Sequence, residues 1–214
     1  MRTGIFISLE GIDGSGKTTQ LERLRLNLAG KGHCVIVAQE PGGTRLGRRI
    51  REILLDTTSH DLRPTPELLL YFASRAQNIA EVIIPSLEEG KIVIADRFTD
   101  ATLAYQGYGR NLGITVVRAI ERIACEGVEP NLTLLLDIDP EIGVSRALAR
   151  NKTQIQNESR MEREDTQFFH KVRNGYLELA AKEPNRIKTI NARGTVDEVE
   201  AAISATVAVL LERL

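Results

Sequence analysis

Residues 6–20 are FISLEGIDGSGKTTQ, and this stretch constrains the fold of the chain more than any other. An apolar run typical of a buried strand stops at a turn with three glycines in six residues. A lysine and two threonines follow directly, and the pattern of a helix then begins. Residues 11–18 therefore fit G-x-x-x-x-G-K-[ST] in the strand–turn–helix setting that this motif requires.

A turn of this kind binds phosphate, because its glycines let backbone N–H groups point inward and the helix N-terminus adds partial positive charge. We expect the chain to bind a nucleoside triphosphate. Lys17 can reach the β- and γ-phosphates, and the Thr18 hydroxyl can ligate Mg²⁺. The predicted triphosphate-binding residues are Gly11, Ile12, Asp13, Gly14, Ser15, Gly16, Lys17 and Thr18.

The rest of the chain alternates between strand and helix patterns without a linker, which predicts one domain over residues 1–214. Near-continuous Val, Ile and Leu in the strands predicts a parallel sheet covered on both faces. Pro85 is expected to kink or break a long helix over 63–90. Strands are expected at 4–10, within 30–40, and at 91–96, 131–139 and 186–192. Further helices are expected near 16–29, 45–55, 114–125, 140–150, 160–182 and 195–213.

Composition limits the partners and the compartment. The net charge of −1 provides no general basic field for nucleic acid. The apolar runs are too short to span a membrane. Cys34 and Cys125 lie far apart and are expected to be reduced thiols, as in a cytoplasmic protein.

Three classes of protein share the phosphate-binding turn. A GTPase should carry N-K-x-D after a strand, whereas residues 151–154 are NKTQ within a polar segment. Motor and transport ATPases are usually larger. A small-molecule kinase needs a second anion site and a closing basic lid, and the polar residues at about 150–165 are expected to form such a mobile lid. The kinase class is therefore favoured.

The second anion site is expected where the third strand ends, at Asp96 and Arg97, since ligands bind at the carboxyl ends of strands in open α/β sheets. Asp96 fits a carboxylate that orders Mg²⁺ through water. Asp137 follows the fourth strand in the same way, and the sequence does not separate the two. Arg51 and Arg75, on other predicted helices, could converge with Arg97 on one phosphate.

A base-binding surface is also suggested by spacing. Tyr71 and Arg75 are four residues apart on a predicted helix and share a face, where they could hold a nucleobase or simply fill the core. Thr102, Tyr105 and Gln106 form a polar cluster just beyond Arg97.

In this order along the chain, seven segments resemble the bacterial thymidylate kinase family: EGIDGSGKTTQ, EPGGT, IREILLD, YFASRAQ, DRFTDATLAYQGYGR, PNLTLLLDI and GYLELA. The resemblance implies a three-layer P-loop kinase fold with a five-stranded parallel sheet in the order 2-3-1-4-5. It also implies transfer of the γ-phosphate of ATP to dTMP with Mg²⁺, as a step towards dTTP. A homodimer through 114–125 and parts of 65–85 is implied as well.

The resemblance assigns roles to individual residues. The monophosphate would be held by Arg51 and Arg97, with Asp13 near the sugar and phosphate and Glu40 bordering the site. Thymine would stack on Tyr71, where the family usually has a phenylalanine, and would bond to Arg75. The remaining contacts would come from Thr102 and Gln106 at the base edge and Tyr105 beside the sugar.

The lid of the family supplies catalytic arginines, and here Arg150, Arg160 and Arg163 lie in that segment, with Arg160 the best match. The expected catalytic residues are Lys17, Arg97 and Arg160.

Departures from the family pattern keep two alternatives open. Gln39 replaces an arginine before EPGG, Ala101-Thr102 replaces a pair of serines, and Ser159 replaces an aspartate before the lid arginine. The chain could be a kinase of broader pyrimidine specificity. It could also be an ATP-binding regulator without catalysis.

Overall fold

The computed structural model describes residues 4–59, 61–151, 160–161 and 164–212. Five strands form one parallel sheet in the order β2-β3-β1-β4-β5, which confirms the expected fold class and strand order. The strands are β1 (Ile5–Glu10), β2 (Val35–Gln39), β3 (Ile92–Asp96), β4 (Leu132–Asp137) and β5 (Ile187–Asn191).

The register of the sheet brings three loops to one edge. Asp96, the last residue of β3, pairs with Leu9 of β1 and with Gln39 of β2. The phosphate-binding turn after β1 and the EPGG segment after β2 therefore both begin beside Asp96. Chain segments that lie far apart in the sequence meet there because parallel strands end at the same edge.

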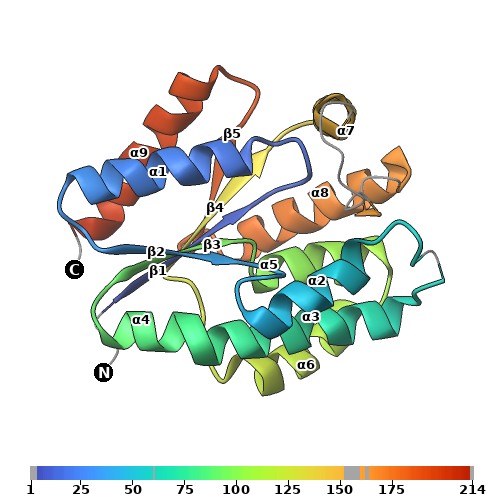
Figure 1. Ribbon diagram of the computed structural model, residues 1–214. Coiled ribbons are helices and arrows are strands. Elements are labelled where there is room, and N and C mark those ends of the chain that lie inside the picture. The colour runs from blue at the N-terminus through green and yellow to red at the C-terminus, as the bar shows by residue number, and fades with distance from the viewer. Residues whose placement is uncertain (1–3, 60, 152–159, 162–163, 213–214) are drawn as a thin grey trace.

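Helices cover both faces of this sheet (Figure 1). On one face, α1 (Lys17–Gly30) lies beside α9 (Val196–Leu211), and Arg23 of α1 binds Asp197 of α9 at 2.5 Å. On the other face lie α3, α4 and α6. The further helical segments are α2 (Arg45–Leu55), α3 (Pro64–Asn78), η1 (Ile79–Ile83), α4 (Ile84–Glu88), α5 (Thr99–Thr102), η2 (Leu103–Gly109), α6 (Ile114–Cys125), α7 (Pro140–Asn151) and α8 (Thr166–Lys182). Among the described residues, no helix is both long and apolar enough to cross a membrane.

The long helix expected over 63–90 is helical from Pro64 to Glu88, with a π-helical turn, η1, just before Pro85. Proline lacks the N–H that an α-helix would use and its ring crowds the carbonyl four residues earlier. The wider π-helical turn falls on this stretch, so the chain stays helical through the proline and does not break there.

Two helical boundaries differ from the expectation. The helix expected from residue 160 begins at Thr166, because the Asp165 side chain accepts the backbone N–H of Phe168 and caps the first turn. Residues 101–109, expected only to supply a polar cluster, form the end of α5 and the π-helix η2. Helical spacing therefore sets which side chains of this segment face the site.

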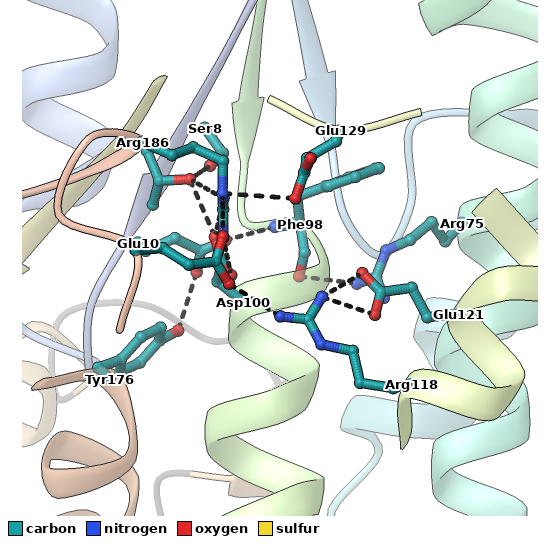
Figure 2. A network of polar contacts seen from close by, with 12 residues as sticks. Ser8, Glu10, Arg75, Phe98, Asp100, Arg118, Glu121, Glu129, Tyr176 and Arg186 are labelled. Atoms are coloured by element: carbon teal, nitrogen blue, oxygen red, sulfur yellow. Dashed lines mark hydrogen bonds and ion pairs between the residues drawn. The ribbon is translucent and has the colours of Figure 1, made fainter. Parts of the chain in front are cut away.

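A buried ion pair crosses the core between α5 and the start of β5. Asp100 is 1% exposed and accepts two bonds from Arg186, at 2.7 and 2.9 Å, and one from the Thr133 hydroxyl at 2.9 Å. Thr133 in turn bonds to Ser8 on the neighbouring strand. Figure 2 shows Asp100 and Arg186 within this network. Losing Arg186 would leave the Asp100 carboxylate buried without its ion-pair partner.

We expect Asp100→Asn to lower the free energy of unfolding by about 3 kcal/mol. Arg186 then loses its buried charge partner and, among the described residues, keeps only the more exposed Glu183 and Glu129. Urea unfolding would measure the loss. The double variant D100N/R186M should recover part of it. As a control, Glu178→Gln removes a solvent-exposed pair with Lys182 and should leave the unfolding midpoint unchanged. Equal losses of unfolding free energy in Asp100→Asn and Glu178→Gln would contradict the stabilising role of the Asp100–Arg186 ion pair.

Candidate active site

The phosphate-binding turn between β1 and α1 depends on its glycines. Gly14 has a φ of 76°, and a Cβ at this position would lie 2.0 Å from the carbonyl oxygen of Gly143 on α7. Gly11 has a φ of 136°. Side chains other than glycine are strained at such angles, so the close, inward-facing turn requires this sequence. Ile12 and Ser15 are buried beneath the turn.

Lys17 folds back over the turn that precedes it. Its Nζ donates to the carbonyl oxygens of Gly11 at 3.0 Å and Ile12 at 2.9 Å. Burial, together with the positive charge of Arg97, lowers the pKa of Lys17 to about 8, against the opposing effect of Asp13. An anion bound in the turn would supply the negative charge that this buried ammonium lacks.

A cavity of about 490 Å³ opens in front of the turn and gathers most of the predicted site. Its walls come from the phosphate-binding turn, the EPGG segment, α2, α3, the end of β3 and the α5–η2 segment. The predicted residues that line it are Asp13, Gly14, Gly16, Lys17, Thr18, Glu40, Arg51, Tyr71, Arg75, Asp96, Arg97, Thr102, Tyr105 and Gln106.

Arg97 connects the phosphate-binding turn to the end of β3. Its guanidinium donates to the carbonyl of Gly11 at 3.0 Å and to Asp13 at 2.7 Å, and lies 4.9 Å from the centre of the Tyr105 ring. Its backbone has a φ of 71°, which is unfavourable for a residue with a side chain. Backbone strain of this kind concentrates at functional sites, where the surroundings enforce it.

Glu10 provides part of that enforcement. Its carboxylate accepts the backbone N–H of Phe98, next to Arg97, at 2.6 Å and the Tyr176 hydroxyl at 2.8 Å (Figure 2). Burial, reinforced by the nearby carboxylate of Asp100, raises the pKa of Glu10 to about 8. Glu10 therefore fixes the chain immediately after the strained residue.

Arg75 lies deeper in the wall of the cavity than its sequence position suggested. It is 2% exposed and donates to Glu40 at 2.5 Å, to the Thr102 hydroxyl at 2.8 Å and to the carbonyl of Phe98 at 3.0 Å. Its guanidinium is thus fixed by three partners. Arg51 donates to the carbonyl of Pro41 at 3.0 Å. All three predicted arginines therefore line one cavity.

The two clusters predicted by spacing face this cavity together. Tyr71 and Arg75 share a face of α3, and Thr102, Tyr105 and Gln106 share a face of α5 and η2. Burial raises the pKa of Tyr71 to about 12, so its hydroxyl stays protonated.

The two candidate aspartates differ in their contacts. Arg173 of α8 holds both carboxylate oxygens of Asp137, at 2.7 and 2.9 Å. Asp96 lines the cavity, as does Thr18. An oxygen from each, with phosphate oxygens and water, suits Mg²⁺, which seldom takes an all-protein cage.

Arg160 belongs to a cluster that the sequence did not reveal. It donates to the carbonyl of Leu54 at 2.6 Å and to Glu67 at 2.6 Å. Its neighbour Met161 lines the cavity. In the sequence, Glu67 stands out only as an acidic residue in the otherwise apolar helical segment TPELLLY, residues 65–71. Arg163 lies outside the described residues, as does the side chain of Arg150.

Known proteins similar to this chain are kinases, in agreement with the geometry of the cavity. The family model described as thymidylate kinase matches residues 9–203. The thymidylate kinase of Syntrophotalea carbinolica is 52% identical over 195 residues, 91% of this chain and 90% of the relative. That of Maridesulfovibrio salexigens is 48% identical over 95% of this chain and 94% of the relative. That of Deinococcus radiodurans is 47% identical over 97% of this chain and 98% of the relative. The chain therefore belongs to the thymidylate kinase family.

Proposed function

We propose that the chain transfers the γ-phosphoryl group of ATP to dTMP, giving dTDP and ADP. The observation that carries this proposal is that the phosphate-binding turn and three arginines line one cavity. A donor phosphate on the turn and an acceptor phosphate on Arg97 would face each other there. The family to which the chain belongs supports dTMP as the acceptor.

The donor side uses the turn at 11–18. Backbone N–H groups and the α1 N-terminus bind the phosphates of ATP. Lys17 leaves the carbonyls of Gly11 and Ile12 for the β- and γ-phosphates. Thr18 and Asp96 would hold Mg²⁺, directly or through water. When bound, Mg²⁺ neutralises charge on the phosphates.

The acceptor side uses Arg97 and Arg51 for the monophosphate, and Asp13 keeps the Arg97 guanidinium aligned at 2.7 Å. Arg75 offers its remaining N–H groups to a thymine carbonyl, and Glu40 holds it in place. Tyr71 stacks on the base. The remaining contacts come from Thr102 and Gln106 at the base edge and Tyr105 at the sugar.

Phosphoryl transfer between these groups depends on positioning and charge neutralisation. The acceptor is already an anion, so no strong general base is needed. Lys17 and Arg97 offset the charge that accumulates as the two phosphates approach. Arg160 is the proposed lid arginine, and to reach the phosphates it has to break its bonds to Glu67 and Leu54. Its catalytic role stays a prediction.

We also propose a cytoplasmic homodimer without nucleic acid as a partner. Val116 and Ile123 of α6 and Leu69 of α3 are 47%, 80% and 51% exposed. These apolar side chains lie on the two helices predicted for the dimer, and a second copy would cover them. The net charge of −1 gives nucleic acid no general attraction.

An ADP-release assay with dTMP, dUMP, UMP, CMP and AMP tests the reaction. We expect dTMP to give the highest kcat/KM. Comparable rates with several pyrimidine monophosphates would support the broader specificity that Gln39 and Tyr71 leave open. Release of ADP that does not depend on any monophosphate would contradict the proposal and support a regulator.

Arg97→Ala should raise the KM for dTMP and lower kcat by about 10²-fold or more, because a phosphate loses its charge-assisted donors. Steady-state kinetics would separate the two effects. Arg25→Ala removes an exposed arginine that pairs with Glu22 and serves as the matched control. Unchanged kinetics in Arg97→Ala would contradict the proposed role of Arg97 in binding the monophosphate.

Asp96→Asn should raise the Mg²⁺ concentration needed for half-maximal activity about tenfold, because a carboxylate ligand is lost. Asp137→Asn is the matched control: it breaks the Arg173 pair and should leave the Mg²⁺ midpoint unchanged. A shift in Asp137→Asn alone would reverse the assignment of the two aspartates.

A further inference from the structure

Glu67 is a buried carboxylate that lies behind the cavity and has four side-chain bonds. Its Oε1 accepts from Gln106 Nε2 at 2.8 Å and Arg110 Nε at 3.1 Å. Its Oε2 accepts from Arg160 at 2.6 Å and Arg110 at 3.3 Å. Glu67 itself is 0% exposed, so this arrangement is shielded from water.

The bond to Gln106 fixes which end of its amide faces the cavity. An ionised carboxylate only accepts hydrogen bonds, so the NH₂ group of Gln106 has to point at Glu67. The carbonyl oxygen Oε1 is then the polar atom that Gln106 can offer to a ligand. Gln106 is 1% exposed and lines the cavity, so rotation towards bulk water is not an alternative.

Glu67 stays ionised despite its burial. Burial alone would raise the pKa of this carboxyl group, but the charge of Arg110 and the hydrogen bonds of Arg110, Gln106 and Arg160 hold it below its usual value. Because Arg110 contacts both oxygens, the carboxylate keeps a cationic partner even when Arg160 leaves.

We infer that Glu67 is a positioning residue for base selection, which orients the Gln106 amide so that its carbonyl oxygen meets the N3 position of the acceptor base. This inference rests on the proposed use of dTMP, with thymine beside Gln106. Thymine carries N3–H, a donor, whereas cytosine has an acceptor at N3. A cytosine would therefore place two acceptors face to face in a buried site, which is strongly disfavoured.

Replacing Glu67 by glutamine should invert this selection. The new amide has one acceptor oxygen and one NH₂ group. If the new NH₂ group took the place of Oε2, it would face N–H donors of both Arg110 and Arg160. If it took the place of Oε1, it would face Arg110 and the side-chain amide of Gln106. Only Gln106 can turn over and offer an oxygen instead. The NH₂ group of Gln106 would then face the cavity and favour an acceptor at N3.

The test is kcat/KM for dTMP and for dCMP in the unaltered enzyme and in Glu67→Gln. We expect the ratio of dTMP to dCMP to fall by about tenfold or more, with dCMP gaining in absolute terms. Arg110→Lys is the matched control, because it replaces the guanidinium that makes two bonds to Glu67 but keeps a cation beside the carboxylate that Gln106 contacts. It should keep the ratio while lowering thermal stability.

The possible results distinguish the inference from the function. Failure of the unaltered enzyme to use dTMP would overturn the proposed function. If the unaltered enzyme uses dTMP but Glu67→Gln lowers kcat/KM equally for dTMP and dCMP, Glu67 has a structural role only. That result would overturn the inference.

If Glu67→Gln does not fold, NMR of the dTMP-bound unaltered enzyme decides instead. The NH₂ protons of Gln106 should show contacts to the Arg110 side chain. Contacts to thymine N3–H in their place would overturn the inference.

Discussion

The guanidinium of Arg97 joins the phosphate-binding turn to the end of β3, and the site depends on this link. It binds the Gly11 carbonyl and the Asp13 carboxylate, which belong to the turn, while its own backbone follows β3. The sheet register makes the link possible, since β1 and β3 pair up to Asp96. The strained φ of Arg97 persists because Glu10 holds the next backbone N–H. The donor and acceptor phosphates proposed for this cavity are thereby brought to one place.

Around this link, carboxylates organise the arginines in and beside the cavity. Glu40 fixes Arg75, Asp13 aligns Arg97, and Glu67 gathers Arg110 and Arg160. Burial of each ion pair costs desolvation free energy. In return, a guanidinium with several fixed partners is held in one orientation. A rigid arginine can discriminate between a carbonyl and an amino group on a base. The same constraint reaches Gln106 through Glu67.

Much of the fold and the phosphate-binding part of the site could be predicted from local patterns. Strand and helix periodicity predicted the parallel sheet, and the motif at residues 11–18 predicted the triphosphate-binding turn. The helix over 63–90 was predicted correctly. Of the kink or break expected at Pro85, the break is absent, because the missing N–H coincides with a π-helical turn. The helical form of 101–109 was missed, because a π-helix of 7 residues is too short to show a hydrophobic period. Glu67 was missed because an acid on an apolar helix has an ordinary surface interpretation.

The sequence by itself determined that a glycine turn between strand and helix would bind phosphates, since that property is local to eight residues. It also predicted that Arg51, Arg75 and Arg97 could converge on one phosphate, but not which side chains would bond to one another. The tertiary structure decided that Asp96 faces the cavity while Arg173 neutralises Asp137. It also decided that Glu67 contacts Gln106, a residue 39 positions away. Pairings of this kind depend on how helices pack over the sheet, and no spacing along the chain encodes them.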